Sequence, residues 1–450
     1  MSKRGILIHN AKIFTEKNTF RGSLRIENEL IAEIFKGEVP ENVLQNNTVI
    51  DASDLWLLPG VIDTHVHFRE PGLTQKADIY TESRAAVAGG VTSFIDMPNT
   101  IPQTTTLALW EEKCSLASEK SLANYSFYLG ATSENKEEIR QADPKKIPGV
   151  KLFMGASTGN MQVTDKEFLQ WLFAESPLLV MAHCEDSSVI QRNIETFKAQ
   201  FGDNIPVSNH PLIRSSEACY KSTAVAVEMA MRYNTRLHVA HISTAHELAL
   251  FDINRSLAEK KITAEGCVHY LWFDSNDYER LGARIKCNPA IKTEADKKAL
   301  IQAISSNRLD TVATDHAPHL LTDKEGGCLQ AASGIPLIQH SLPAMLQLAR
   351  HGQFTVEKVV EKMSYAPATL FRIPRRGYVR KGYFADLVLV DPNNRWTVAP
   401  ENIVSKCGWS PFEGQEFHAR VTHTFVNGHL VYDNGKFDES LKGKELQFNG

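Results

Sequence analysis

The 450-residue sequence lacks several patterns that define other classes of protein. Its seven cysteines are few, odd in number and scattered without a CxxC pair, which argues against a disulfide framework or a cysteine-rich zinc module. No uninterrupted apolar run approaches the roughly 18 residues that a membrane-spanning helix needs. The N-terminal stretch MSKRGILIHNAKIF has no long apolar segment followed by small residues. We therefore expect no signal peptide, no membrane partner and a cytoplasmic location.

Two further classes are excluded by the charge and glycine patterns. The net charge is −4 and the pI about 6.5, and short lysine pairs such as Lys145-Lys146 form no basic stripe. No nucleic-acid partner is therefore expected. A doubly wound sheet that binds a dinucleotide would require a GxGxxG motif after its first strand. No such motif follows LLPGVIDTHVH, the first apolar run of residues 56–364.

Both ends of the chain have the alternating apolar and polar pattern of half-buried strands. Residues 1–55 contain GILIHNAKIF and SLRIENELIAEIF, and residues 365–450 contain ADLVLVD and ARVTHTFVNG. Asn427-Gly428 and Asn434-Gly435 are strong tight-turn signals between strand-like runs. We predict that the two ends together form one small β-sandwich-like domain, interrupted by a long insert.

The insert, residues 56–364, alternates short apolar runs with segments of helical length. Such alternation, repeated eight times, predicts a TIM (β/α)8 barrel, with an open doubly wound sheet as the competing architecture. The eight runs are LLPGVIDTHVH, GVTSFIDMPNT, NYSFYLGAT, GVKLFMG, PLLVMAHCE, RLHVAHIST, KITAEGCVHY and DTVATDHAPH. The expected helices include 104–120, 165–174, 215–233, 244–259 and 292–306, with Thr104, Asp165, Ser215 and Thr293 as capping residues.

Polar residues end most of these apolar runs, which is informative because both faces of a barrel strand are covered. The active site of a TIM barrel lies at the C-terminal ends of its strands. In strand order the terminal polar residues are His65 and His67, Asn99, Thr132, Lys151, His183, His241, His269 and Asp315. Metal-competent side chains on several strands predict a metal centre at this end of the barrel.

The four candidate histidine ligands follow two patterns. His65 and His67 are two residues apart on one strand, which places both rings on one face, roughly 6–7 Å apart, so that they can bind one ion. Two ordinary histidines near a turn are the alternative. His183 and His241 each follow an apolar residue and an alanine on successive strands. That shared register favours metal ligands over buried structural histidines.

Asp315 and Lys151 complete the candidate ligand set. A carboxylate buried after an apolar run must be paired or bind a metal, and the nearby histidines favour a metal for Asp315. His316 and His319 are then expected near the mouth of the pocket. Lys151 cannot bind a metal as an ammonium. It is either paired with the substrate or Asp315, or it has reacted with carbon dioxide to give an anionic carbamate that bridges two ions.

These residues resemble the cyclic-amide-hydrolysing amidohydrolases and, within them, the dihydroorotases. The resemblance covers nearly the whole chain and includes the terminal β domain and the C-terminal segments APATLF and SPFEG. It implies two Zn²⁺ ions, one bound by His65 and His67 with Asp315, the other by His183 and His241. Carboxylated Lys151 and a hydroxide would bridge them, with zinc, cobalt and manganese all compatible with these ligands.

The substrate is indicated by the run His67-Phe68-Arg69-Glu70-Pro71-Gly72, which is similar to the dihydroorotase HxREPG signature. The planar guanidinium of Arg69 suits a carboxylate, unless it is only a surface partner of Glu70 or Asp78. The resemblance implies a small-molecule substrate held by Arg69, Asn99, Asn288 and His319, and a reversible cyclisation of N-carbamoyl-L-aspartate in which Asp315 moves the proton. The alternatives are an allantoinase, hydantoinase or dihydropyrimidinase, a non-catalytic homologue, or a metal-free sugar- or nucleotide-binding barrel.

Two stretches depart from the family pattern. Dihydroorotases often have a Pro-Phe-Gly-like turn whose backbone meets the ring, whereas this chain has Ala331-Ala332-Ser333-Gly334. The stretch 155–160 also differs from the commoner loops, and we expect it to act as a lid. Because barrels of this kind often form closed symmetric dimers, a homodimer is expected.

Overall fold

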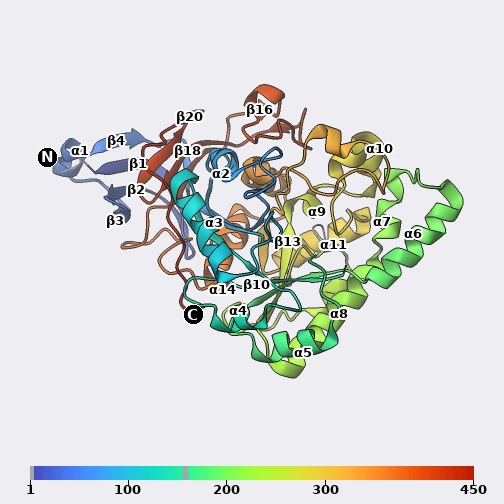
Figure 1. Cartoon of the computed structure of the whole chain (residues 1–450). Helices are drawn as coiled ribbons and strands as arrows, with labels where there is room; N and C mark the ends of the chain where they lie inside the picture. The colour runs from blue at the N-terminus through green and yellow to red at the C-terminus, as the bar shows by residue number, and fades with distance from the viewer. Residues whose placement is uncertain (1–4, 156–160) are drawn as a thin grey trace.

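Eight strands form a parallel barrel in the middle of the chain, as the alternating pattern predicts. The computed structural model describes residues 5–155 and 161–450, so the expected lid at 156–160 lies outside the described residues. The barrel strands are β6 (Val61–Val66), β7 (Val91–Asp96), β8 (Asn124–Phe127) continued by β9 (Leu129–Gly130), β10 (Val150–Met154), β11 (Val180–Cys184), β12 (Leu237–Val239), β13 (Ile262–Cys267) and β14 (Thr311–Ala313). The two architectures of the chain, TIM barrel and small β-sandwich domain, are therefore those expected from the sequence (Figure 1).

The strands of the barrel wall form two hydrogen-bonded groups, β6-β7-β8 and β9-β10-β11-β12-β13-β14. The wall closes where β6 lies beside the segment after β14: Val66 forms a parallel bridge with His316, and the His67 N–H donates to the His316 carbonyl at 2.7 Å. Buried Asp63 adds to this closure by accepting a 2.6 Å hydrogen bond from the Thr314 hydroxyl. These contacts fix the relative positions of the first and last strand ends.

Helices cover the outside of the barrel. They include α2 (Ile79–Ala88), α3 (Leu107–Lys120), α4 (Lys136–Gln141), α5 (Lys166–Glu175), α6 (Ser187–Phe201), α8 (Ser216–Tyr233), α11 (Glu294–Ser305) and α12 (Ser341–Arg350). Asp165, Ser215 and Thr293 cap α5, α8 and α11 as predicted, each accepting from a backbone N–H. Within the described chain, no helix combines the length and the apolar character needed to cross a membrane.

Two helix predictions were wrong. The helix expected from Thr104 begins three residues later, at Leu107, because Thr106 is the residue whose side chain caps it. The helix expected over 244–259 is only the short 3₁₀ segment Glu247–Leu250. Beyond it, Asp252 accepts from the Asn254 N–H, and Glu259 accepts from the Ser256 N–H and hydroxyl. Such local side-chain bonds compete with helical hydrogen bonds and favour turns.

The terminal domain is built from both ends of the chain. One nine-stranded sheet has the order β20-β19-β18-β15-β5-β1-β2-β3, with β4 pairing with β1. Its strands are β1 (Ile6–Phe14), β2 (Thr19–Glu27), β3 (Leu30–Phe35), β4 (Thr48–Asp51), β5 (Trp56–Pro59), β15 (Leu387–Asp391), β18 (Arg420–Val426), β19 (His429–Asp433) and β20 (Lys436–Phe437). In Figure 1 the blue N-terminal strands lie beside the red C-terminal strands.

The two Asn-Gly turns of this domain have the backbone conformation that their sequence predicts. Asn427 and Gly428 have φ values of 50° and 74°, as two-residue hairpin turns require. A side chain at Gly428 would bring its Cβ within 2.2 Å of the Asn28 carbonyl oxygen, so that only glycine fits there. The hairpin β18–β19 is thereby held against the N-terminal strands.

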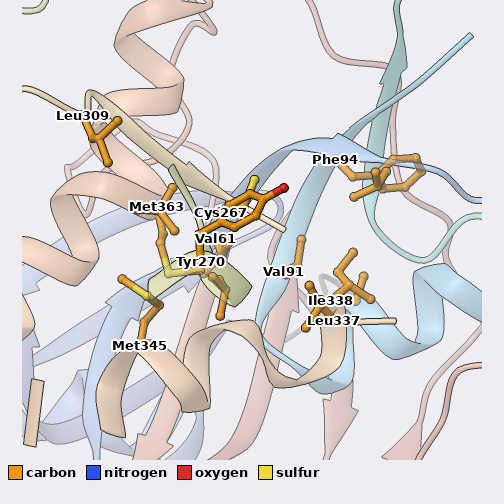
Figure 2. Close-up of a cluster of buried hydrophobic side chains, with 14 of the residues drawn as sticks. Val61, Val91, Phe94, Cys267, Tyr270, Leu309, Leu337, Ile338, Met345 and Met363 are labelled. Carbon is orange, nitrogen blue, oxygen red and sulfur yellow. The ribbon is translucent and has the colours of Figure 1, made fainter. Parts of the chain in front are cut away.

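A continuous apolar core joins the barrel wall to its covering helices. Figure 2 shows one part of it, where Val61 and Val91 of the first two strands lie near Ile338 and Met345 of the segment 338–350. All seven cysteines are buried and unpaired, and Cys267 belongs to this core. The core therefore holds the strand ends, and with them the polar residues that the sequence places there, in a fixed arrangement.

Candidate metal centre and substrate pocket

A pocket at the C-terminal end of the barrel brings together most of the predicted site residues. It is lined by His65, His67, Arg69, Lys151, Phe153, His183, His241, Asn288, Asp315, Ala317, Ser333 and Gly334. All six predicted metal ligands are in this lining, although they come from strands far apart in sequence. Of the four predicted substrate contacts, Arg69 and Asn288 line the pocket, whereas Asn99 and His319 lie behind its wall.

His65, His67 and Asp315 form one half of the centre. The Nε2 atoms of His65 and His67 lie 3.2 and 3.1 Å from the same oxygen of Asp315, Oδ1. Burial alone would raise the pKa of Asp315, but the two neighbouring rings outweigh it and hold that pKa below its ordinary value. One carboxylate oxygen and two ring nitrogens at this spacing are suited to a shared divalent cation.

His183 and His241 form the other half. His183 Nδ1 lies 2.8 Å from His241 Nε2, and both rings are buried. Burial lowers the pKa of both histidines, and it lowers the pKa of His67 to about 4, so these rings are neutral at pH 7. Neutral imidazoles whose nitrogens face one another are the form that metal ions bind.

Lys151, on β10, lines the same pocket as both halves. Its side chain is 1% exposed, and its Nζ has no hydrogen-bond partner among the described residues. Burial lowers its pKa to about 8, so that a fraction of the amine is uncharged at neutral pH. An unpartnered buried amine is costly and indicates that a group is missing from its surroundings.

Each of three candidate ligands is oriented by a second buried residue. His65 Nδ1 lies 2.7 Å from Glu265, His67 Nδ1 lies 2.8 Å from Asn99 Oδ1, and His183 Nε2 lies 3.0 Å from Glu185. Such partners fix the tautomer and the ring plane of metal-binding histidines. Glu265 and Glu185 were missed in the sequence, although a glutamate inside the apolar run KITAEGC was a signal for the first.

Arg69 is a charged residue in the lining of the pocket. It is 7% exposed, its Nε donates to the Pro318 carbonyl at 3.0 Å, and no carboxylate of the described chain lies within salt-bridge distance. Glu70 and Asp78, the two alternative partners, are instead paired with Lys120 and Lys406. Burial lowers the Arg69 pKa to about 10, which still leaves the guanidinium charged. A buried cation without an anion needs one from a ligand.

The two histidines that follow Asp315 have different surroundings. His319 Nδ1 lies 3.0 Å from Lys76 Nζ, and its Nε2 lies 3.0 Å from Arg69 Nη2 and 3.1 Å from the Ser333 carbonyl oxygen. It supports the pocket wall beside Arg69. The expectation that His316 lies near the mouth was wrong, since His316 is fully buried with Nε2 on Glu82 and Nδ1 accepting two backbone N–H groups.

Three of the pocket residues have strained backbones. Arg69, His241 and Asp315 have φ values of 70°, 41° and 49°, a region that residues other than glycine adopt uncommonly, although His and Asp do so more often than Arg. Such conformations persist only where the surrounding structure enforces them, and they gather at functional sites. Here they direct a carboxylate, an imidazole and a guanidinium into one pocket.

Comparisons with known proteins agree with this geometry. Residues 56–431 match the model of the amidohydrolase family. A dihydroorotase from Methanosphaera stadtmanae is 32% identical over 426 residues, covering 95% of this chain and 96% of that protein. A dihydroorotase from Methanosarcina acetivorans is 33% identical, covering 98% and 93%. An allantoinase from Bacillus velezensis is 32% identical, covering 98% of both chains.

Among solved structures, an L-hydantoinase (dihydropyrimidinase) from Arthrobacter aurescens superposes with a TM-score of 0.91. It is 25% identical in sequence and covers 98% of this chain and 99% of that one. The dihydropyrimidinase of Brevibacillus agri has a TM-score of 0.86 at 25% identity. The resemblance therefore extends over the barrel and the terminal domain together.

Proposed function

This chain belongs to the amidohydrolase family, and from that premise we propose that it is a dihydroorotase, which interconverts N-carbamoyl-L-aspartate and L-dihydroorotate in pyrimidine (UMP) synthesis. The observation that carries the proposal is Arg69, a buried guanidinium on the pocket wall without a carboxylate partner in the described chain. Both compounds bring a carboxylate to it. Hydantoin, dihydrouracil and allantoin do not, so the corresponding enzymes are the runner-up assignment.

The residues present fit a binuclear metal centre. The paired nitrogens of His183 and His241, the shared oxygen of Asp315 and the unpartnered Lys151 Nζ all face one pocket. His65, His67 and Asp315 would hold one Zn²⁺ ion, and His183 and His241 the other. When bound, such ions lower the pKa of water and polarise an amide carbonyl.

Lys151 would bridge the two ions as a carbamate. Its neutral amine adds to carbon dioxide, a bond forms between Nζ and carbon, and one proton is released. The lowered pKa of Lys151 favours this reaction because the neutral amine is the form that reacts. The product is an anion, which replaces an unfavourable buried cation by two oxygen ligands.

The chain's own residues then bind the ring and move the proton. Arg69 holds the carboxylate and so fixes the orientation of the ring. Asn288 lines the same wall, with its Oδ1 3.1 Å from His210 Nε2. In ring opening, Asp315 takes the proton of the attacking water and passes it to the leaving amide nitrogen. Cyclisation reverses these steps and begins with protonated Asp315, so acidic conditions favour cyclisation and alkaline conditions favour hydrolysis.

A substrate panel tests the proposal directly. Purified protein with zinc and bicarbonate is assayed for ring opening of dihydroorotate, dihydrouracil, hydantoin and allantoin. A strong preference for dihydroorotate is the expected result. A preference for an uncarboxylated ring would overturn the substrate assignment, and metal analysis of the same protein would test the binuclear centre separately.

We also propose a cytoplasmic homodimer, which rests on the sequence pattern and the usual closed symmetry of such barrels. Light scattering coupled to size-exclusion chromatography tests this proposal. A monomer of 50.3 kDa at assay concentration would contradict it.

A further inference from the structure

One wall of the pocket is a four-residue turn, residues 331–334. Ser333 and Gly334 line the pocket, and this is the stretch where the sequence departs from the usual Pro-Phe-Gly-like turn. Gly334 has a φ of 143°, and a Cβ there would come within 2.5 Å of the Ala317 carbonyl oxygen and 2.9 Å of the His319 ring. The turn is therefore packed closely against the strand end that carries Asp315.

Three of the four carbonyls of this turn accept a hydrogen bond from a lysine. The donors are Lys286 Nζ to Ala331, and Lys324 Nζ to Ala332 at 2.7 Å and to Gly334 at 2.8 Å, and the Ser333 carbonyl oxygen lies 3.1 Å from His319 Nε2. Backbone bonds add to this, since the Gly334 N–H donates to the Lys286 carbonyl at 2.9 Å. Side-chain and backbone hydrogen bonds together therefore hold the turn, which is not part of a helix or a strand.

Lys324 is an unusual residue for such a task. Its side chain is buried, and its ammonium donates to three carbonyls, those of Ala332, Gly334 and Lys286, which uses all three of its protons. In the described parts of the chain no carboxylate lies within salt-bridge distance of Lys324 or Lys286. Burial lowers the pKa of Lys324 to about 7 and that of Lys286 to about 8, so both amines are close to losing their charge at neutral pH. An anion bound nearby would favour their charged forms.

Lys324 lies near both Lys286 and Arg69, and no carboxylate of the described chain is within salt-bridge distance of any of the three. Charge–charge interactions are much stronger inside a protein than in water, so a negative ligand in the pocket would be stabilised by Arg69 and by the charged forms of the two lysines.

We propose that Lys324 and Lys286 are positioning residues for the substrate: they hold the 331–334 turn and make this wall selective for a carboxylated ring. This inference rests on the proposed function for the identity of that ring. Neither residue lines the pocket, so both act through the turn and through their charge.

The test is Lys324→Met in the full-length zinc enzyme, assayed on dihydroorotate and dihydrouracil. Loss of a charge-assisted hydrogen bond is expected to raise KM for dihydroorotate about tenfold and to lower its kcat/KM relative to dihydrouracil by a similar factor, with unchanged zinc content. Lys286→Met, which removes one carbonyl contact in place of three, should shift the same ratio in the same direction. It replaces Lys324→Met if that variant does not fold.

Lys362→Met is the matched control. Lys362 is also a buried lysine that donates to a backbone carbonyl, at Asp310, and it does not line the pocket. Its substitution should leave the substrate ratio within about twofold. An unchanged ratio in folded Lys324→Met or Lys286→Met, or the same change in Lys362→Met, would overturn the inference. If wild-type protein does not open dihydroorotate, the proposed function fails, and the variants still report whether the turn sets selectivity among the rings it does open.

Discussion

At the scale of single residues, Arg69 combines burial, a left-handed backbone and the absence of a carboxylate partner in the described chain. Replacing it with methionine keeps much of its apolar volume and removes the charge. We expect kcat/KM for dihydroorotate to fall about a hundredfold or more, because an anion would then be buried without its partner. The value for dihydrouracil should change only a few fold. A steady-state assay of both rings decides this, and an equal loss on both, or none, would refute the proposed role of Arg69.

Lys151 gives a second prediction at this scale. Lys151→Ala removes the amine that would carry the carbamate, so the variant should lose bound metal and activity together. A short carboxylic acid such as acetate or propionate should restore part of both, because it supplies two oxygen ligands in the space that remains. Metal content by mass spectrometry and turnover with increasing acid measure this. Full metal occupancy without rescue would contradict the carbamate.

The sequence predicted these side chains because each follows an apolar run at the same end of a strand. His65, His183 and Asp315 needed only that rule. It was not applied to Glu185, the partner of His183, although the two lie two residues apart in the sequence, the same spacing as His65 and His67. Nor could it show that His316, adjacent to Asp315, would point away from the pocket to Glu82.

At the scale of elements, a salt bridge joins Glu185, the residue after β11, to Arg214, the residue after α7 (His210–Ile213). Burial opposes its ionisation, but Arg214 and His183 outweigh this and lower its pKa to about 2, below the ordinary 4.5. Glu185 therefore contributes stability that is complete above pH 4.5 and is lost as pH falls towards 2.

Arg214→Met should remove most of that contribution. In metal-free protein we expect acid unfolding, followed by circular dichroism, to move to higher pH by about one unit. Arg192→Met is the control, since the Arg192–Glu217 pair is exposed and such pairs contribute little. Equal acid unfolding of wild type and Arg214→Met would show that the pair does not stabilise this link.

Helices were predicted correctly where the apolar periodicity and an N-capping residue agreed. The prediction was wrong where side chains formed hydrogen bonds to the nearby backbone. The helix after Ser215 has both signals, and it begins at Ser216 as expected. The stretch 244–259 has an apolar repeat, yet its Asp252 and Glu259 side chains accept hydrogen bonds from the nearby backbone N–H groups of Asn254 and Ser256. Packing against the rest of the fold decides whether such a stretch forms a helix or turns, and that packing cannot be read from the sequence.

At the scale of the whole molecule, the candidate ligands come from β6, β10, β11 and the segments that follow β12 and β14. A bound metal pair would therefore connect opposite sides of the barrel wall. Removing it with a chelator should lower Tm by about 5 °C, since metal that binds only the folded state stabilises it. Differential scanning calorimetry before and after zinc is restored measures this. An unchanged Tm in demonstrably metal-free protein would contradict a centre that spans the barrel.

The barrel and the terminal sheet were both predictable because strand–helix alternation and period-two runs are properties of the sequence alone. The domain boundaries at 55/56 and 364/365 stay predictions. The structure places β5 (Trp56–Pro59) in the terminal sheet, between β1 and β15. The contacts that close the barrel, such as Asp63 with Thr314, join residues 251 positions apart and have no local signal.

The same sheet has a consequence for how the protein is made. Strand β5 pairs with β1 on one side and with β15, more than 320 residues later, on the other. During synthesis the N-terminal strands emerge first, and their open edge stays uncovered until Leu387–Asp391 leaves the ribosome. Uncovered strand edges pair readily with other chains, and distant pairings form slowly. A chain that stops before β15 should therefore aggregate through its first strands, even though every residue of the candidate metal centre has already been translated.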